Sequence, residues 1–222
     1  MRKSYRLAAL LLALTLALGL CLSAAAEEAP PLLISPAPGG TESAAPAFSD
    51  VAADAWYAPY VQALALRGVL HGAPDGGFYP DRAVTRGQVA QVLYALSGST
   101  PVNYLMPFSD VDEGQWYAEG VRWAAALGIA VGSPEGRFEP EAPVSRQDLA
   151  VLLVRFQQKL ELTLPTDGAA PAFADNADIA PYAAEAVYLL QKAGVVSGSP
   201  EGAFGPRTAA TRAELCKLLS AF

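Results

Sequence analysis

The chain has 222 residues, of which 52% are hydrophobic and 17% charged, and its formal net charge is −7 at pH 7. This composition is too apolar for a disordered chain. The excess of 22 acidic over 15 basic residues argues against a nucleic-acid binder, which needs the opposite balance. The two cysteines, Cys21 and Cys216, form neither a CxxC zinc pair nor a disulfide framework, and Cys216 is expected to be a small buried residue among leucines.

The first 26 residues have the order of a secretory signal. Three basic residues precede an apolar run at 7–20, and Ala24-Ala25-Ala26 follows as the expected cleavage site. The run is shorter than the roughly 20 residues that a membrane span needs, which favours a cleaved signal over an uncleaved anchor. We therefore expect an exported protein whose mature chain begins at Glu27 and has no transmembrane segment.

After an Ala/Pro-rich linker at residues 27–46, the sequence repeats itself three times. Related segments begin at Phe48, Phe108 and Phe173, and we place the repeats at 47–106, 107–171 and 172–222. Each repeat has the pattern of a helix, a glycine-containing loop and a second helix. Because one such helix pair cannot bury its own apolar face, the three are expected to pack together. The sequence predicts an all-α fold of three helix-loop-helix repeats.

A hydroxyl residue stands at the expected start of each second helix, with a longer polar residue three positions later. The pairs are Thr85 with Gln88, Ser145 with Asp148, and Thr211 with Glu214. This spacing predicts a capping box, in which the two side chains bind each other's backbone N–H groups.

Capping does not explain the arginine that follows each cap, because the helix dipole disfavours a cation in the first turn. These residues are Arg86, Arg146 and Arg212. Two interpretations carry equal weight. Either the guanidinium and the unpaired N–H groups of the helix start bind an external anion, or the arginines form ion pairs with the repeated aspartates Asp50, Asp110 and Asp175 of another repeat.

Three further kinds of residue recur, each with a structural and a functional interpretation. The aspartates would cap the first helix or accept hydroxyl groups from a ligand. The aromatic positions Trp56 and Trp116, with Tyr182 in the third repeat, would pack in the core or offer a flat face to a sugar ring. The glycines Gly72, Gly132 and Gly198 would allow a turn with positive φ or a close approach of ligand to backbone.

The sequence gives little support for a catalytic activity. Glycoside hydrolysis needs one pair of carboxylates in unlike environments, whereas the acids here are spread over three equivalent repeats. The single histidine, His71, corresponds to Val131 and Ser197, which indicates surface variation rather than a general base. The sequence therefore predicts a protein that is not an enzyme and needs no cofactor or metal; a cell-wall hydrolase is the weakest alternative.

The repeated motifs resemble the S-layer homology (SLH) domain. They are FSD near the start, Trp-Tyr after it, G-x-P-[DE]-G-x-F-x-P in the loop, and TRGQ, SRQD or TRAE at the second helix. The resemblance covers about Ala47 to Phe222. It implies a pseudo-threefold bundle with grooves between adjacent repeats, which anchors exported proteins to the bacterial surface by binding secondary cell wall polysaccharide, often through pyruvate ketals on its sugars.

The resemblance also implies which residues form the binding grooves. The arginine of each second helix would contact the anionic ketal, and the aspartates, tryptophans and loop glycines would complete the grooves. The full set is Arg86, Arg146, Arg212, Asp50, Asp110, Asp175, Trp56, Trp116, Gly72, Gly132 and Gly198. The third repeat departs from the pattern at Tyr182 and Arg207. The resemblance therefore supports the first two grooves more strongly than a groove that depends on the aromatic residue of the third repeat.

The expected partner is thus an anionic cell-wall polysaccharide at the cell surface, with surface-layer or envelope proteins as further partners. The alternative is a structural module that packs against a partner protein or peptidoglycan in the envelope.

Overall fold

The structure is a computed structural model that describes residues 48–222. The predicted signal (1–26) and linker (27–46) lie outside the described residues. Within 48–222 there are six α-helices and one short 3-10 helix, η1 (Asn176–Asp178). The α-helices are α1 (Ala58–Leu66), α2 (Arg86–Leu96), α3 (Ala118–Ala126), α4 (Arg146–Lys159), α5 (Pro181–Lys192) and α6 (Arg212–Leu219). The described residues form no β-strand and only three isolated bridges, which confirms the all-α prediction.

The first helix of each repeat ends where the sequence places a glycine. Gly68, Gly128 and Gly194 all have positive φ, between 66° and 70°, a conformation that costs side-chain-bearing residues energy. After α1, the N–H of Val69 donates back to the carbonyl of Leu64 over 3.0 Å. This arrangement satisfies helix-end carbonyls and turns the chain into the loop.

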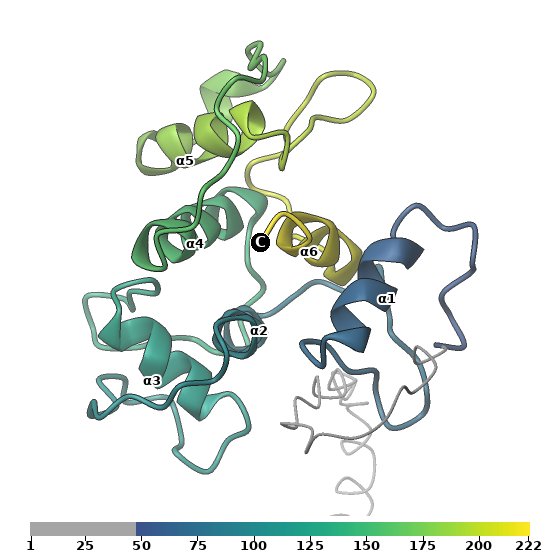
Figure 1. The fold of residues 1–222 in the computed structure, drawn as a ribbon. Helices are drawn as coiled ribbons and strands as arrows, with labels where there is room; N and C mark the ends of the chain where they lie inside the picture. Colours follow the sequence, from purple (N-terminus) through teal and green to yellow (C-terminus); the bar gives the residue numbers. More distant parts are fainter. Residues whose placement is uncertain (1–47) are drawn as a thin grey trace, which may run out of the picture. The chain divides into compact units, whose positions relative to one another are not determined.

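Helices pair between repeats rather than within them. Helix α2 packs on α3, α4 packs on α5, and α6 packs on α1. Each second helix therefore finds its partner in the next repeat, and the last pair joins the third repeat to the first. Figure 1 shows the consequence: α2, α4 and α6 lie at the centre, and α1, α3 and α5 lie outside them.

The segments that lead into the three central helices are joined by a closed ring of backbone hydrogen bonds. The N–H of Val84 donates to Ala210, the N–H of Ala210 to Val144, and the N–H of Val144 to Val84, each over 2.9 Å. All three residues are at most 1% exposed. Because each repeat supplies one donor and one acceptor, every repeat is needed to satisfy the buried backbone groups of the other two.

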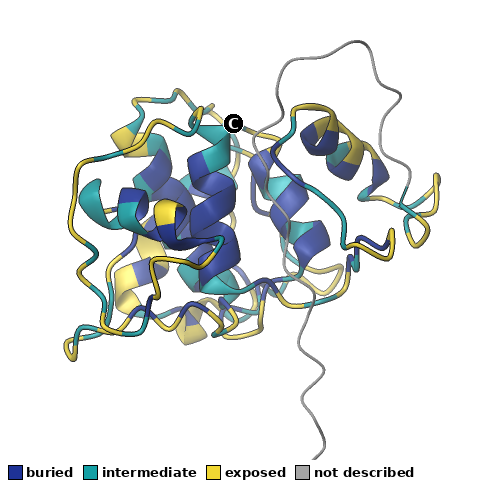
Figure 2. Ribbon diagram, turned by 90° about the horizontal axis from the view of Figure 1, so that it is seen from below, coloured by how far each residue is buried: buried dark blue, intermediate teal, exposed yellow. Residues whose placement is uncertain are grey.

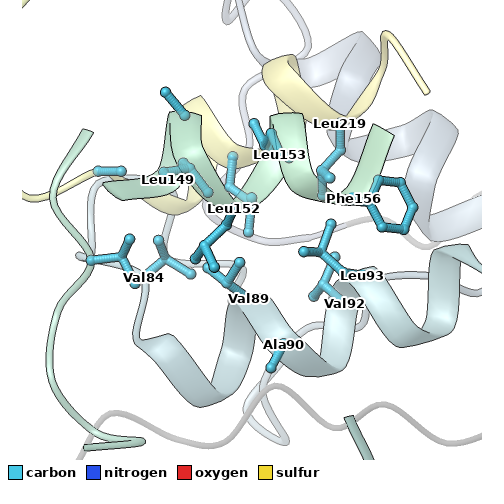
Figure 3. Packing of buried hydrophobic residues seen from close by; sticks show 14 of the residues in the cluster. Val84, Val89, Ala90, Val92, Leu93, Leu149, Leu152, Leu153, Phe156 and Leu219 are labelled. Atoms are coloured by element: carbon cyan, nitrogen blue, oxygen red, sulfur yellow. The ribbon is translucent and has the colours of Figure 1, made fainter. Parts of the chain in front are cut away.

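The core lies between the central helices, where apolar side chains at helical spacing face one another. In Figure 3, Val89 and Leu93 of α2 lie toward Leu149 and Leu153 of α4, and Leu219 of α6 lies nearby. These side chains are at most 1% exposed. Their spacing of three to four residues is the one that the sequence pattern predicts for a buried helix face.

Burial is concentrated on the inward sides of the helices, and exposed residues lie mainly in the loops and on outer helix faces (Figure 2). Cys216 is 1% exposed, which confirms its prediction as a buried residue, and burial raises the pKa of its thiol to about 12. Among the described helices, none combines the length and apolar character needed to cross a membrane.

Candidate functional site: the inter-repeat grooves

The predicted capping boxes form at two of the three second helices. Thr85 with Gln88 and Thr211 with Glu214 bind each other's backbone N–H groups in both directions. At the third helix, Ser145 accepts from the N–H of Asp148, but the Asp148 carboxylate accepts the Ser145 hydroxyl at 2.5 Å instead of the backbone N–H. Aspartate is one methylene shorter than glutamate, and the box is incomplete there.

The prediction of unpaired N–H groups at these helix starts is wrong. In α2 the first two helical N–H groups, of Arg86 and Gly87, donate to the carbonyls of Ala142 and Pro140 at 3.0 and 2.8 Å. The loops of the neighbouring repeats serve α4 and α6 in the same way. Because carbonyl oxygens already accept from the first two helical N–H groups of each second helix, these donors are not free for an anion.

The repeated arginines bind the neighbouring loop through one edge of the guanidinium. The Nε of Arg86, Arg146 and Arg212 donates over 2.7 Å to the carbonyls of Phe138, Phe204 and Phe78, respectively. Each guanidinium also lies 4.5 to 5.0 Å from the ring of the same phenylalanine. Each arginine therefore joins its own repeat to the next through a hydrogen bond and a cation–π contact.

The three arginines differ in how their charge is compensated. Arg146 forms an ion pair with Glu214, whose other carboxylate oxygen serves the capping box. Arg86 has no carboxylate partner among the described residues and instead donates to the carbonyl of Val131. Arg212 is only 6% exposed. None of the arginines forms a direct ion pair with the repeated aspartate of the neighbouring repeat, so the predicted ion pairs are wrong, and these opposite charges attract only at longer range.

The same aspartates hold the loops instead. Asp50, Asp110 and Asp175 each accept two consecutive backbone N–H groups, at 2.6 to 2.8 Å, from the loop segment that begins at the phenylalanine. For Asp110 and Asp175, burial favours the neutral acid, but these hydrogen bonds outweigh it and lower the pKa. The described aspartates neither cap the first helices nor pair with the arginines; they fix the walls of the grooves.

The repeated loop glycines have a packing role that the sequence analysis missed. Gly72, Gly132 and Gly198 are absent from the residues with positive φ, so the predicted turn requirement is wrong. A Cβ atom at Gly132 would lie 2.4 Å from the ring of Phe108 and 2.5 Å from the carbonyl oxygen of Arg137. Phe108 in turn packs on Phe138 with ring centroids 5.1 Å apart. The glycine is required because the phenylalanine ring occupies the place of a side chain.

A cavity of about 390 Å³ lies beside Arg146, and we call it the Arg146 groove. All three repeats contribute to its lining: Trp56, Arg146, the loop around Gly198, and Glu214 and Lys217 of α6. Its floor is apolar, with Leu149 and Val196. Lys217 donates to Ser197 at 3.2 Å. The charged groups that line the groove are therefore one ammonium group, one guanidinium and the single carboxylate of Glu214.

A second cavity of about 320 Å³ lies beside Arg86, and we call it the Arg86 groove. It is lined by Arg86, Arg137, Glu139 and Asp148, with Gly132 in its wall. Two cations and two carboxylates balance its charge. The two cavities occupy corresponding positions between successive repeats, which places the predicted arginines and glycines of these repeats together.

Two of the three aromatic positions are exposed, and the third packs against the core. Trp56 is 56% exposed and Tyr182 is 62% exposed, while Trp116 is partly buried. The hydroxyl of Tyr182 donates to Asp148 at 2.7 Å, which places it at the edge of the Arg86 groove; burial and this hydrogen bond raise the pKa of Tyr182 to about 12. The rim interpretation therefore holds for Trp56 and Tyr182.

Sequence analysis missed Lys217 and Arg137 as groove residues. Neither residue recurs in the other repeats. The residues that correspond to Lys217 are Gln91 and Val151, and those that correspond to Arg137 are Gly77 and Ala203. A search for repeated residues cannot find a residue that makes one groove different. The described residues contain no group of three or more side chains suited to hold a metal ion.

Comparison with known proteins agrees with this architecture. The S-layer homology domain matches residues 47–90, 107–150 and 172–216, which is more than half of the chain. The chain therefore belongs to the S-layer homology domain family, with three tandem copies of the domain.

Similar segments occur in larger proteins with different names. The chain is 28% identical to exoglucanase XynX of Acetivibrio thermocellus, over 85% of this chain and 17% of that protein. It is 30% identical to cell surface glycoprotein 1 of Acetivibrio thermocellus, over 69% of this chain and 7% of that protein. It is also 30% identical to the surface-layer 125 kDa protein of Lysinibacillus sphaericus, over 54% of this chain and 10% of that protein.

The chain thus spans less than a fifth of each of these relatives. The shared segment thus occurs both in a protein named as an exoglucanase and in proteins named for the cell surface. Family membership supports a role in cell-surface anchoring.

Proposed function

We propose that this protein anchors non-covalently to the bacterial cell wall by binding an anionic secondary cell wall polysaccharide in its inter-repeat grooves. The observation that carries the proposal is the Arg146 groove, where Arg146, Lys217 and the exposed face of Trp56 line one cavity. A carboxylate on a sugar, such as a pyruvate ketal, matches this combination of two cations and an aromatic face.

Arg86 and Arg146 each have donors left for such a ligand. The Nε group is used on the neighbouring loop, so the ligand would meet the terminal nitrogens. In the Arg146 groove the incoming carboxylate competes with Glu214 for the guanidinium, and Lys217 supplies a second charge. The indole of Trp56 would lie against the sugar ring, opposite the loop that contains Gly198.

A single groove is expected to hold one sugar weakly. A hydrogen bond to a charged group contributes about 1.5–3 kcal/mol, and an exposed ion pair often less than about 1 kcal/mol. A polymer presents many repeats, so occupation of one groove raises the effective concentration of ligand at the next by avidity factors of about 10² or more when the spacing fits. Because the chain as a whole is acidic, binding should weaken as salt screens the local cations.

The test is cosedimentation of the mature chain with purified cell-wall sacculi that retain their polysaccharide. The variant R86Q/R146Q should lose most of its binding, because both open grooves lose their guanidinium. The control R67Q/R207Q removes the same charge from exposed positions outside both grooves and should bind like the natural sequence. Circular dichroism must show that all variants are folded, since the arginines also join the repeats.

A gain-of-binding variant strengthens this test. Glu214→Gln keeps a capping side chain, as Gln88 does in the first repeat, and releases Arg146 from its ion pair. Binding should tighten severalfold, in line with an ion pair worth less than about 1 kcal/mol. Unchanged binding in both R86Q/R146Q and Glu214→Gln would refute the role of the grooves.

Sacculi treated with mild acid to remove ketals separate the proposal from the alternative module. Retention that survives this treatment would favour a partner protein or peptidoglycan as the bound component.

A further inference from the structure

Arg212 is far less accessible than the other two repeated arginines. It is buried, at 6% exposed, whereas Arg86 and Arg146 are half-buried and each lines an open cavity. Burial lowers the pKa of Arg212 to about 10, an effect that Arg82 reinforces. The three repeats supply the same arginine and the same phenylalanine contact, so the difference must come from the residues around it.

The first repeat places larger side chains at the positions that line the open grooves. The Arg146 groove is lined by Ser197, Gly205 and Thr208 of the third repeat, and the Arg86 groove by Val131, Glu139 and Ala142 of the second. In the first repeat, which faces Arg212, the corresponding residues are His71, Tyr79 and Arg82. Each is at least as large as its counterparts, and two are much larger.

These positions lie directly against the arginine. A Cβ atom built on Gly205 would be 3.9 Å from Cδ of Arg146, so the side chain of Tyr79 begins at the corresponding place beside Arg212. The N–H of Arg212 donates to the carbonyl of Arg82 at 2.9 Å, which brings the Arg82 backbone to the same helix start.

Tyr79 is also held in place from two sides. Its hydroxyl donates to the carboxylate of Asp75, and the guanidinium of Arg82 lies 3.9 Å from its ring centroid. Tyr79 adopts φ of 58°, and the corresponding Glu139 and Gly205 have φ of 59° and 69°. The backbone is thus alike in the three repeats, and the size of the Tyr79 side chain distinguishes the first one.

We propose that Tyr79 and Arg82 plug the third groove, so that the protein binds its polysaccharide at two sites, the Arg86 and Arg146 grooves, and not at three. This inference rests on the proposed function, because it divides the same kind of site into open and closed copies. Arg212 then serves to join the third repeat to the first through the carbonyl and ring of Phe78.

The variant Y79G/R82A tests the plug. It replaces Tyr79 by the glycine found at the corresponding Gly205 of the third repeat, and Arg82 by the alanine found at the corresponding Ala142 of the second repeat. The probe is a methyl hexopyranoside with a pyruvate ketal, and native mass spectrometry counts the molecules bound to the mature chain at saturation. We expect two for the natural sequence, one each for R86Q and R146Q, two for R212Q, and three for Y79G/R82A.

Each outcome decides between distinct explanations. Three molecules on the natural sequence would overturn the plug and leave the proposed function intact. Two molecules on the folded Y79G/R82A variant would also overturn it, because the opened groove would then be unable to bind. No binding to any variant would overturn the proposed function and the plug with it.

A second measurement needs no ligand and uses the single variant R82A if the double variant fails to fold. Phenylglyoxal modifies accessible guanidinium groups, and peptide mapping reports each arginine separately. Arg212 should react at least tenfold more slowly than Arg86 in the natural sequence and approach its rate in R82A or Y79G/R82A. Equal rates for Arg86 and Arg212 in the natural sequence would contradict a closed groove.

Discussion

Arg86 shows how a cation is accommodated in the first turn of a helix. The N–H groups that create the positive end of the helix dipole donate to carbonyls of the next repeat, and Nε of the same arginine donates to the carbonyl of Phe138. Carbonyl oxygens therefore screen the guanidinium from the helix start. One terminal nitrogen donates to the carbonyl of Val131, and the side chain lines the Arg86 groove, so one residue combines an assembly contact and a candidate binding group.

Asp110 shows how a repeated carboxylate stabilises a loop. Replacement by asparagine removes the charge from two hydrogen bonds to the N–H groups of Phe138 and Glu139, and we expect a loss of about 1–2 kcal/mol in the free energy of unfolding, reduced by the partial exposure of the site. Urea denaturation measures this change. The control Asp81→Asn, at an exposed position, should differ from the natural sequence by less than about 0.5 kcal/mol.

The pH dependence of the same variant has a definite sign. The pKa of Asp110 is lowered in the folded protein, so its contribution is present above the unfolded pKa of about 3.9 and is lost as pH falls through the folded pKa. Acid should therefore destabilise the natural sequence below about pH 4 more steeply than Asp110→Asn. Parallel stability curves for the two proteins would contradict the role of the carboxylate.

At the scale of the elements, the loops are as constrained as the helices. The phenylalanine that begins each repeat packs against the loop glycine and against the second phenylalanine of its repeat, as Phe173 does with Phe204 at 5.3 Å. Together with the aspartate bridges, these contacts fix the loop that supplies carbonyl acceptors to the next helix. A rigid loop is thus a condition for both the helix start and the groove wall.

Gly132→Ala tests this constraint. The added Cβ would lie 2.4 Å from the Phe108 ring and 2.5 Å from a backbone carbonyl, so the loop must shift, and we expect a cost of about 2–3 kcal/mol measured by thermal unfolding. At Gly198 the nearest atoms would be 3.1 to 3.2 Å away, and Gly198→Ala should cost clearly less. Equal effects of the two substitutions would argue against the steric explanation.

At the scale of the whole described region, the repeats depend on one another through a closed cycle. Helix α6 packs on α1, and the buried N–H of Val84 donates to Ala210. Neither contact can form until the third repeat is present. The fold should therefore unfold as one cooperative unit rather than repeat by repeat.

Deletion of residues 172–222 tests this dependence. The remaining repeats lose the partners of α1 and α4, and buried backbone groups of Val84 and Val144 lose theirs. We expect loss of the cooperative thermal transition by circular dichroism and loss of amide exchange protection in α1. Addition of residues 172–222 as a separate polypeptide should restore protection in part; a truncated chain as stable as the intact one would show that ring closure is dispensable.

Much of this architecture could be predicted from the sequence because its signals are local. The cap of Thr211 and the residue that completes it are three positions apart, and Gly68 ends a helix through its own φ. The three copies of these signals predicted the repeats, the helices and the family. Even here the length of one side chain mattered, since Asp148 does not complete the box that Gln88 and Glu214 complete.

The tertiary structure alone decided which repeat each group faces. The sequence cannot show that Asp110 binds loop N–H groups, that Phe108 fills the space beside Gly132, or that Arg82 lies over the ring of Tyr79. These contacts join residues distant in the chain, and their geometry depends on how three similar units close into a ring. The three repeated arginines therefore differ in solvent exposure, because exposure depends on the residues packed around each arginine and not on the motif that contains it.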